Sequence, residues 1–389
     1  MSVTYRIDKQ ETYVSVIPVR IGGLHNDSFN HSSVLRIKNM SDKLIGFPDE
    51  RGQQARLHDA MGRPLRDLRI SVMDRCNFRC PYCMPEDKYH KDFEFLSSDQ
   101  RLSFAEIIRI TRIFAGLGVH KLRITGGEPL LRANLPELVA ELSAVQGIDD
   151  VALTTNGILL AQHAAALSAA GLDRVTVSLD SLDDEVFKAM SGGRGSRKRV
   201  LEGINEAQQS GLTPIKVNVV VKQGVNDRTV LDMVEHFRGT GIIVRFIEYM
   251  DVGTINHWKR SETVPASELV EQINARWPMA PVASNYHGEV ANRYIFADGE
   301  GEVGFINSVA QPFCGSCTRA RLSSDGKLFT CLFAASGMDL RTPLRGDIND
   351  QDLTAMISSA WTRRTDRYSE LRAENNAPTD RVEMYYIGG

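Results

Sequence analysis

The sequence predicts an α/β protein in which helices cover a parallel β-sheet, either doubly wound or formed into a barrel. The chain has 389 residues, 42% hydrophobic and 24% charged, a composition typical of one large globular domain with additional elements. From Asp67 onward, short β-branched runs alternate with longer amphipathic segments. This alternation is repeated six times and stops near Asp251.

The predicted strands are near-continuous apolar runs, as in strands that are buried on both faces. They cover 68–72, 122–125, 151–155, 174–179, 215–221 and 243–248. The first predicted helix follows Ser103, which forms a capping-box pattern with Glu106 before a run rich in isoleucine. Further helices are predicted at 135–144, 158–170, 197–209 and 229–238.

The two ends of the chain differ from this repeat. Residues 1–50 combine mixed charges with several turn formers, which predicts a poorly ordered extension. After Asp251, hairpins are predicted from 293–297, 302–307 and 319–328, followed by helices within 349–373. A second functional region is therefore expected at 252–389.

Charge and hydropathy exclude several classes of protein. The formal net charge of −3 argues against a polybasic nucleic-acid coat protein. The longest stretch without charged residues, 151–172, is too polar to span a bilayer. Pro18 and Arg20 interrupt the apolar residues near the N-terminus, and no cleavage site follows them. We therefore expect a cytoplasmic protein with neither a membrane nor a nucleic acid as its partner.

The six cysteines form two groups of three, which in the reducing cytosol favours metal binding over disulfides. The first group, Cys76, Cys80 and Cys83, directly follows the first predicted strand. This spacing could also place three cysteines on one helix face, but Pro81 would break that helix. Zinc usually has four protein ligands in structural sites, whereas three thiolates suit a [4Fe–4S] cluster with one open iron.

The second group, Cys314, Cys317 and Cys331, again offers three thiols. A zinc site completed by His287 is the alternative to a second [4Fe–4S] cluster. Arg319 and Arg321 are two residues apart in a predicted strand, so both guanidinium groups face the same side. Paired planar donors of this kind suit phosphate oxygens.

These motifs resemble known families. The Cys-x3-Cys-x2-Cys spacing, with Tyr82 before the last cysteine, and Gly126-Gly127-Glu128-Pro129 after the second strand resemble the radical S-adenosylmethionine (SAM) superfamily. The chain from about Gly62 to its end resembles the GTP 3′,8-cyclase family of molybdenum cofactor biosynthesis. The matching segments are 65–71, 121–129, 153–157, 178–180, 216–219, 245–253 and the terminal 386–389.

The resemblance implies a partial (β/α)6 TIM-type barrel with a C-terminal α+β extension that closes the open side. It implies a barrel at 51–251 with one [4Fe–4S] cluster, and a region at 252–389 with a second cluster and a Gly-Gly tail that enters the active site. The implied enzyme is a lyase that uses SAM to convert GTP into 3′,8-cyclo-7,8-dihydro-GTP. In that reaction a 5′-deoxyadenosyl radical abstracts the C3′ hydrogen, and the ribose carbon then adds to guanine C8.

The resemblance also implies roles for particular residues. It assigns SAM binding to Tyr82, Gly127, Ser178 and Met250, with Glu128 beside them. It assigns GTP binding to basic and neighbouring residues expected at the barrel mouth: Arg69, Arg123, Thr154, Lys216, Arg319, Ala320 and Arg321. Arg245, expected at the end of the sixth strand, is a weaker candidate for the same site.

The implied partners are a one-electron donor, a cyclic pyranopterin monophosphate synthase that takes over the product, and a second copy in a homodimer. Three other functions remain as alternatives. A peptide-modifying radical SAM enzyme usually has more C-terminal cysteines, and an electron carrier would not explain Gly-Gly-Glu-Pro. An RNA-modifying enzyme would need a basic stripe that this chain lacks.

Overall fold

The computed structural model describes residues 57–372 and 381–388, which belong to one compact unit that extends over 49–389. The extension predicted at 1–50 lies outside the described residues, so its poor order stays a prediction. The functional boundary predicted near residue 251 falls inside the compact unit. It too stays a prediction.

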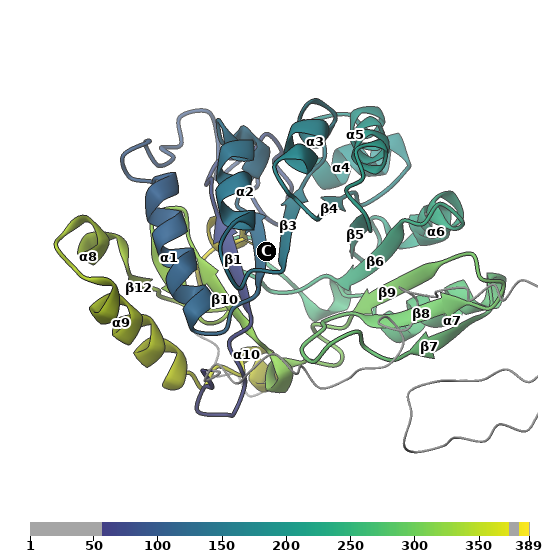
Figure 1. The fold of residues 1–389 in the computed structure, drawn as a ribbon. Helices are drawn as coiled ribbons and strands as arrows, with labels where there is room; N and C mark the ends of the chain where they lie inside the picture. The colour runs from purple at the N-terminus through teal and green to yellow at the C-terminus, as the bar shows by residue number, and fades with distance from the viewer. Residues whose placement is uncertain (1–56, 373–380, 389) are drawn as a thin grey trace, which may run out of the picture. The chain divides into compact units, whose positions relative to one another are not determined.

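The described strands form one twelve-stranded sheet, and most of the helices lie on its outer side (Figure 1). Its centre consists of six parallel strands in chain order. They are β1 (Asp67–Ser71), β2 (Lys121–Thr125), β3 (Asp150–Thr155), β4 (Arg174–Ser178), β5 (Lys216–Val221) and β6 (Ile243–Glu248). The predicted α/β class and the six β/α repeats are confirmed.

The helices between these strands match the predicted segments, with one addition. They are α1 (Phe104–Gly116), α2 (Leu135–Ser143), α3 (Leu160–Ala169), α4 (Asp184–Ser191), α5 (Arg197–Gln209) and α6 (Val230–Phe237). The predicted capping box opens α1, where the Ser103 hydroxyl accepts the Glu106 amide at 3.2 Å. The short helix α4 was not predicted, because it buries only Phe187, Met190 and Ser191.

The C-terminal extension lengthens the sheet at both edges and leaves the sheet open. Beside β1 it adds β10 (Arg319–Leu322) in parallel, followed by the antiparallel strands β11 (Lys327–Phe329) and β12 (Met338–Asp339). Beside β6 it adds β9 (Glu302–Ile306) in parallel, followed by β8 (Asn292–Phe296) and β7 (Met279–Val282). The barrel is therefore partial, with β12 and β7 as its edges.

The remaining described helices belong to this extension. They are α7 (Ala266–Arg276), α8 (Arg341–Arg345), α9 (Asp350–Thr362), α10 (Tyr368–Leu371) and α11 (Met384–Ile387). Among the described residues, no helix has both the length and the apolar character needed to cross a membrane. The last of these helices, α11, contacts β1 of the central sheet.

Strand β1 illustrates how the fold positions charged side chains inside the curve of the sheet. Leu68 and Ile70 are fully buried in the hydrophobic core that the strands share with the helices. Side chains alternate along a strand, so Arg69 faces the opposite side. In β2, Leu122 and Ile124 are likewise buried, and Arg123 between them faces the opposite side. The inner side of this sheet is therefore polar, although near-continuous apolar strands were predicted.

Candidate active site

A cavity lies against the inner side of the sheet and is strongly basic. Its lining includes eight arginine or lysine residues and two acidic ones, Asp67 and Asp366. The basic residues are Arg69, Lys121, Arg123, Arg174, Arg245, Arg319, Arg321 and Arg364. Such an excess of positive charge favours a polyanionic ligand.

Three of these arginines form a row across neighbouring strands. Arg69 of β1 is in register with Arg321 of β10 on one side and with Arg123 of β2 on the other. Neighbouring strands are about 4.8 Å apart, so three guanidinium groups share one short stretch of the cavity wall. The prediction that Arg319 and Arg321 share a face is also confirmed, since both line the cavity.

The basic residues lie nearer the amino ends of the strands than predicted. Lys121, Arg174, Lys216 and Arg319 are the first residues of their strands. Arg245, which was expected at the end of the sixth strand, is the third of the six residues of β6, so this prediction was wrong. The cations therefore occupy the interior and the amino-terminal end of the partial barrel.

Hydroxyl and amide groups hold two of the arginines in place. Arg123 Nη1 donates to the hydroxyls of Thr154 and Thr176 at 3.0 and 3.2 Å. Arg245 Nε donates to Asn218 Oδ1 at 3.0 Å. These neutral partners orient the guanidinium groups and leave their charge uncompensated.

Burial and repulsion between neighbouring cations make the charged forms of several of these side chains costly, whereas Asp150 and Cys317 stabilise the charge of Arg174 and Arg319, respectively. Burial and neighbouring arginines lower the pKa of Arg123 to about 10, that of Arg245 to about 9 and that of Arg321 to about 10. Lys216 does not line the cavity, yet burial, Arg245 and Arg174 lower its pKa to about 7. A bound polyanion would relieve this repulsion.

The first thiol loop, Cys76–Cys83, follows β1 and is not helical, as Pro81 predicted. The amides of Cys83 and Met84 both donate to the carbonyl of Cys80, at 3.0 and 2.9 Å. Arg79 closes the loop by donating to the carbonyls of Cys76 and Tyr89, both at 2.7 Å. All three cysteines are free thiols.

Gly126 and Gly127 are needed where the segment after β2 passes the first thiol loop. A Cβ atom on Gly126 would lie 2.3 Å from the Met73 carbonyl oxygen, and one on Gly127 would lie 2.3 Å from that of Arg75. Only glycine permits so close an approach. The Gly-Gly pair therefore positions the start of the thiol loop against the sheet.

Glu128 links the same segment to β3. Its buried carboxylate accepts hydrogen bonds from the Thr155 hydroxyl at 2.7 Å and from the Asn156 amide at 2.8 Å. Burial raises the pKa of Glu128 to about 7, although these hydrogen bonds act in the opposite direction.

The residues predicted to bind SAM lie at the carboxyl ends of the strands. Ser178 is the last residue of β4, and Met250 follows β6 and lines the cavity. The Tyr82 hydroxyl donates to Asp180 Oδ2 at 2.8 Å, which ties the first thiol loop to the segment after β4. Gly127 donates its own amide to the Met73 carbonyl at 2.7 Å.

Carboxylates surround the first thiol loop. Burial and then Glu128 raise the pKa of Cys76 to about 12. Burial also raises the pKa of Cys80 and of Cys83, with further contributions from neighbouring thiols and from Asp180 and Glu383 respectively. This loop would suit a ligand that carries positive charge.

The second thiol loop has the opposite surroundings. Cys314, Cys317 and Cys331 all line the cavity. Arg319 Nη2 donates to Cys317 Sγ at 3.1 Å. Burial alone would raise the pKa of Cys317, but Arg319 and Arg364 outweigh it and lower the value to about 6. Burial raises the pKa of Cys331 to about 11.

A single zinc ion needs ligands that converge on one point, each about 2.0–2.3 Å from the metal. Within 57–372 and 381–388, no three His, Cys, Asp or Glu side chains are arranged to hold one ion. A [4Fe–4S] cluster has four separate irons, so its thiolates do not need to converge. The free thiols of each loop fit this wider arrangement, with several carboxylates near the first loop and several arginines near the second.

The two thiol loops lie at opposite ends of the same pair of parallel strands. Cys76 follows the carboxyl end of β1, whereas Cys317 precedes the amino end of β10, and Arg319 pairs in register with Asp67. A five-residue strand spans roughly 13 Å at about 3.3 Å per residue. The arginine row lies between the two loops.

Ala320 is the one predicted GTP-site residue whose side chain turns away from the cavity. It is buried in the hydrophobic core and pairs in register with Leu68. Sequence reasoning also missed Arg174, Asn218 and Tyr286, all of which line the cavity. Arg174 could have been predicted as a site residue, because it is a basic residue at the start of a strand, as are Lys121 and Lys216.

The C-terminal tail reaches both halves of the site. Arg321 Nη1 donates to the carbonyl of Gly388, and a Cβ atom on Gly388 would lie 2.1 Å from Thr125 Cγ2. Glu383 anchors the tail by accepting from the amide and hydroxyl of Thr254, both at 2.9 Å. Gly389 lies outside the described residues.

Comparisons with known proteins identify the family to which the chain belongs. Residues 70–237 match the Radical SAM superfamily model, and residues 242–370 match the model named Molybdenum Cofactor Synthesis C. The chain is 54% identical over 335 residues to a GTP 3′,8-cyclase from Xanthomonas campestris pv. campestris, covering 86% of this chain and 98% of that protein. It is 46% identical to one from Staphylococcus haemolyticus, covering 86% and 99%.

Among solved structures, the chain resembles Streptococcus suis SuiB bound to S-adenosylmethionine with a TM-score of 0.54. The two are 15% identical, and the likeness covers 83% of this chain and 77% of SuiB. This comparison supports the fold.

Proposed function

Because the chain belongs to the GTP 3′,8-cyclase family of radical SAM enzymes, we propose that its basic cavity binds GTP between two iron–sulfur clusters. The reaction is the conversion of GTP into 3′,8-cyclo-7,8-dihydro-GTP, the first step of molybdenum cofactor biosynthesis. One observation carries the proposed placement: the row of Arg321, Arg69 and Arg123 lies between the two thiol loops.

The basic residues bind the triphosphate. Guanidinium groups offer planar pairs of donors that match phosphate oxygens, and their low local dielectric strengthens each contact. The proposed set is Arg69, Arg123, Thr154, Lys216, Arg319, Ala320 and Arg321, with Arg174 and Arg245 added on the geometry. Ala320 would contribute through its backbone, because its side chain is in the core.

Thr154 has a positioning role in this scheme. Its hydroxyl accepts from Arg123 Nη1 and so holds one member of the arginine row. Holding the triphosphate at several points fixes the nucleotide in one orientation, which lowers the entropic part of the barrier for the reacting ribose and base.

SAM binds at the carboxyl ends of the strands, beside the first thiol loop. Cys76, Cys80 and Cys83 would hold the first cluster, and Tyr82, Gly127, Ser178 and Met250 would surround SAM. Together this cluster and SAM supply the one-electron chemistry that activates the substrate. The carboxylates of Glu128, Asp180 and Glu383 favour the sulfonium and ammonium charges of SAM at this end.

Cys314, Cys317 and Cys331 would hold the second cluster at the amino ends of the strands. Family membership supports the use of SAM and an iron–sulfur cluster, and the second cluster is our proposal from the second set of three free thiols. Since all three cysteines line the cavity, such a cluster would supply a coordination position for the guanine base there. The Gly388 carbonyl, held by Arg321, limits the space left for water.

The reaction needs partners that the chain does not supply. A one-electron donor must deliver electrons to the first cluster, and we propose cyclic pyranopterin monophosphate synthase as the enzyme that receives the product. A homodimer in the cytoplasm is the proposed working state.

Anaerobic reconstitution with iron and sulfide, followed by incubation with GTP, SAM and a strong reductant, tests the proposal. We expect about eight irons per chain, 5′-deoxyadenosine, and a cyclised nucleotide by mass spectrometry, at four irons per cluster. Serine at Cys76, Cys80 or Cys83 should stop SAM cleavage. Serine at Cys314, Cys317 or Cys331 should retain about half the iron and some 5′-deoxyadenosine but yield no cyclised nucleotide.

The matched comparison is between the two sets of serine variants prepared in parallel. Full zinc occupancy in the C-terminal variants, or normal product from them, would refute a substrate-binding second cluster. Modification of a peptide without any cyclisation of GTP would instead point to the peptide-modifying alternative.

A further inference from the structure

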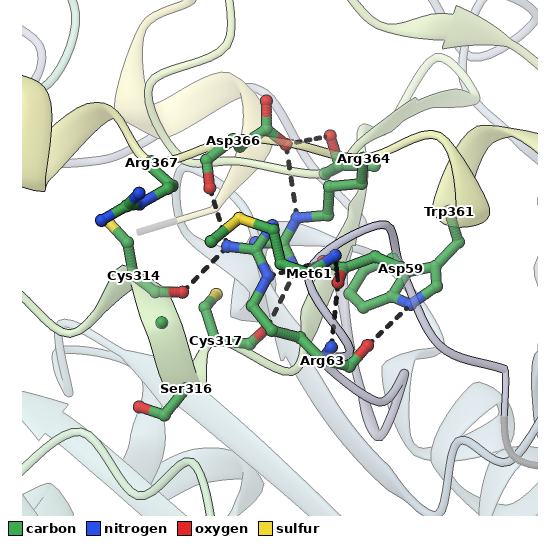
Figure 2. A network of polar contacts seen from close by, with 12 residues as sticks. Asp59, Met61, Arg63, Cys314, Ser316, Cys317, Trp361, Arg364, Asp366 and Arg367 are labelled. Atoms are coloured by element: carbon green, nitrogen blue, oxygen red, sulfur yellow. Dashed lines mark hydrogen bonds and ion pairs between the residues drawn. The ribbon is translucent and has the colours of Figure 1, made fainter.

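A largely buried polar frame lies beside the second thiol loop (Figure 2); it includes none of the residues predicted to bind GTP or SAM, although Arg364 and Asp366 also line the cavity. It consists of Asp59, Arg63, Arg364 and Asp366. The side chains of Asp59, Arg63 and Arg364 are 0%, 2% and 1% exposed, respectively. Burying charged groups to this degree is costly unless their partners are well placed.

Asp59 organises the segment before β1. Its Oδ1 accepts the amides of Met61 and Arg63, each at 2.9 Å, and its Oδ2 accepts Arg63 Nε at 2.5 Å. Arg364 Nη1 lies 3.6 Å from the same Oδ2. One carboxylate therefore orients two guanidinium groups that lie about 300 residues apart in the sequence.

The two guanidinium groups donate hydrogen bonds to backbone carbonyls of the second thiol loop. Arg63 Nη1 donates to the carbonyl of Cys314 at 2.9 Å, and Arg364 Nη1 donates to that of Cys317 at 2.8 Å. Arg63 Nη1 also donates to the Asp366 carbonyl at 2.7 Å. Figure 2 shows both arginines beside the two cysteines.

The frame reaches the third cysteine as well. The Asp366 carboxylate accepts from the Thr330 hydroxyl at 2.5 Å, and Thr330 directly precedes Cys331. Arg364 Nε donates to the same carboxylate oxygen at 3.3 Å. All three cysteine-bearing segments are thus tied to one set of four charged side chains.

The two arginines and two aspartates of the frame balance formally in charge, but only one of the carboxylates is as deeply buried as the guanidinium groups. Two buried guanidinium groups face one fully buried carboxylate, while the carboxylate of Asp366 is 33% exposed. Arg63 Nη2 is buried and has no hydrogen-bond partner among the described residues. Thiolates in front of the frame would supply negative charge, and cluster binding requires deprotonated thiols.

We propose that Asp59, Arg63, Arg364 and Asp366 are positioning residues that hold the second thiol loop in the geometry required for its cluster. This inference rests on the second cluster proposed above. Hydrogen bonds to its backbone carbonyls hold the loop against the frame. The frame therefore sets the positions of the thiols without binding iron. Arg63 must be arginine, because it uses Nε for Asp59 and Nη1 for two carbonyls at once, which lysine cannot do.

The variants Arg63→Lys and Asp59→Asn test the frame with little change in volume. Arg276→Lys is the control, because Arg276 is 47% exposed and its ion pair with Glu235 lies at the surface. In the reconstituted full chain, we expect Arg63→Lys to lose iron from the second cluster about 10- to 100-fold faster under a chelator, as for other groups that orient metal ligands. The electron paramagnetic resonance spectrum of the second cluster, recorded in a Cys80→Ser background, should change.

5′-Deoxyadenosine formation without GTP should be unchanged in Arg63→Lys, which shows that the first cluster and the fold survive. An unaltered second-cluster spectrum with normal iron retention would overturn the proposal. Equal loss of both clusters together with a lowered melting temperature would also overturn it, since the frame would then serve general stability.

A second measurement separates this inference from the proposed function. In the full chain before reconstitution, Arg63→Lys should speed alkylation of Cys314 and Cys317 several-fold but leave Cys76, Cys80 and Cys83 unchanged. Equal rates in the variant and the parent chain would contradict a frame that holds the loop. If Arg63→Lys speeds alkylation but the reconstituted parent chain binds no second cluster, the frame holds the loop for another purpose, and both its cluster function and the proposed second cluster are refuted.

Discussion

The two thiol loops contain the same number of cysteines but differ in how they are held and in the charge around them. The first loop is closed by its own Arg79 and lies among the carboxylates of Glu128, Asp180 and Glu383. The second is held from behind by residues distant in sequence and lies among arginines.

This difference indicates which ligand each loop can accept. SAM carries a sulfonium and an ammonium group, so nearby carboxylates lower the free energy of its bound form. GTP carries several negative charges, which arginines such as those of the second half would stabilise. In the proposed function, two similar cysteine patterns thus differ in role because their surroundings differ in charge.

The tail provides the strongest test of this comparison, because it contacts both halves. We expect removal of Gly388-Gly389 to abolish cyclisation, and Gly388→Ala to lower it by about 100-fold, since a displacement of about 1 Å can have that effect. Gly388 has a φ of 71°, and its added Cβ would collide with Thr125. The measurement is the turnover number for cyclised product.

Serine at Thr125 in the Gly388→Ala chain is the matched control, because Ser lacks the Cγ2 atom that the new methyl would meet. Partial recovery of turnover in this double variant is expected. A normal turnover number for the chain without its two terminal glycines would contradict a role for the tail.

The arginine half of the comparison is tested by Arg319→Ala and Arg321→Ala. Each should weaken GTP binding by about 1.5–3 kcal/mol, or roughly 10- to 100-fold, because a charged hydrogen-bond donor is lost from a buried site. SAM cleavage without GTP should persist, since the first loop is unchanged. Arg276→Ala, at an exposed ion pair, should leave GTP affinity as it is; unchanged affinity and cyclisation in both cavity variants would rule out the assignment.

The carboxylate half is tested by Asp180→Asn. This change removes a negative charge beside the first loop and weakens the hydrogen bond from Tyr82, which is now 2.8 Å long. We expect SAM affinity to fall by about 1 kcal/mol, roughly fivefold, with GTP affinity unchanged. Equilibrium dialysis of both ligands measures this split, and Asp184→Asn, at an exposed pair with Arg197, is the control. An equal loss for both ligands would contradict separate electrostatic roles.

The smallest expected effect is the uptake of a proton when GTP binds. The pKa of Lys216 is about 7 in the free chain, whereas a nearby triphosphate would raise it towards its ordinary value. Between pH 7 and 9, GTP binding should therefore take up as much as about one proton, and GTP affinity should decrease as the pH rises. Calorimetry in two buffers with different ionisation enthalpies measures the uptake. Lys216→Arg should bind GTP without it, and uptake that persists in this variant would assign the proton to another group.

Much of the fold and several site residues could be predicted from local patterns. The capping box at Ser103 and Glu106, the alternation of strands and helices, and the break that Pro81 imposes all depend on residues close together in sequence. The Gly-Gly-Glu-Pro segment belongs to the same group, since its position after a strand is a local property. Such features are set by backbone geometry and short-range hydrogen bonds, which a sequence displays directly.

The sequence by itself determined the two sets of three thiols, the six β/α repeats and the basic side chains of the strands. Only the tertiary structure decided that Arg321 pairs with Arg69, and that β10 and β9 extend the two edges of the sheet. It also brought Arg63 and Arg364 together behind Cys314 and Cys317. Pairing between distant segments depends on the register of parallel strands and on the packing of the whole core, and no local pattern in the chain encodes either one.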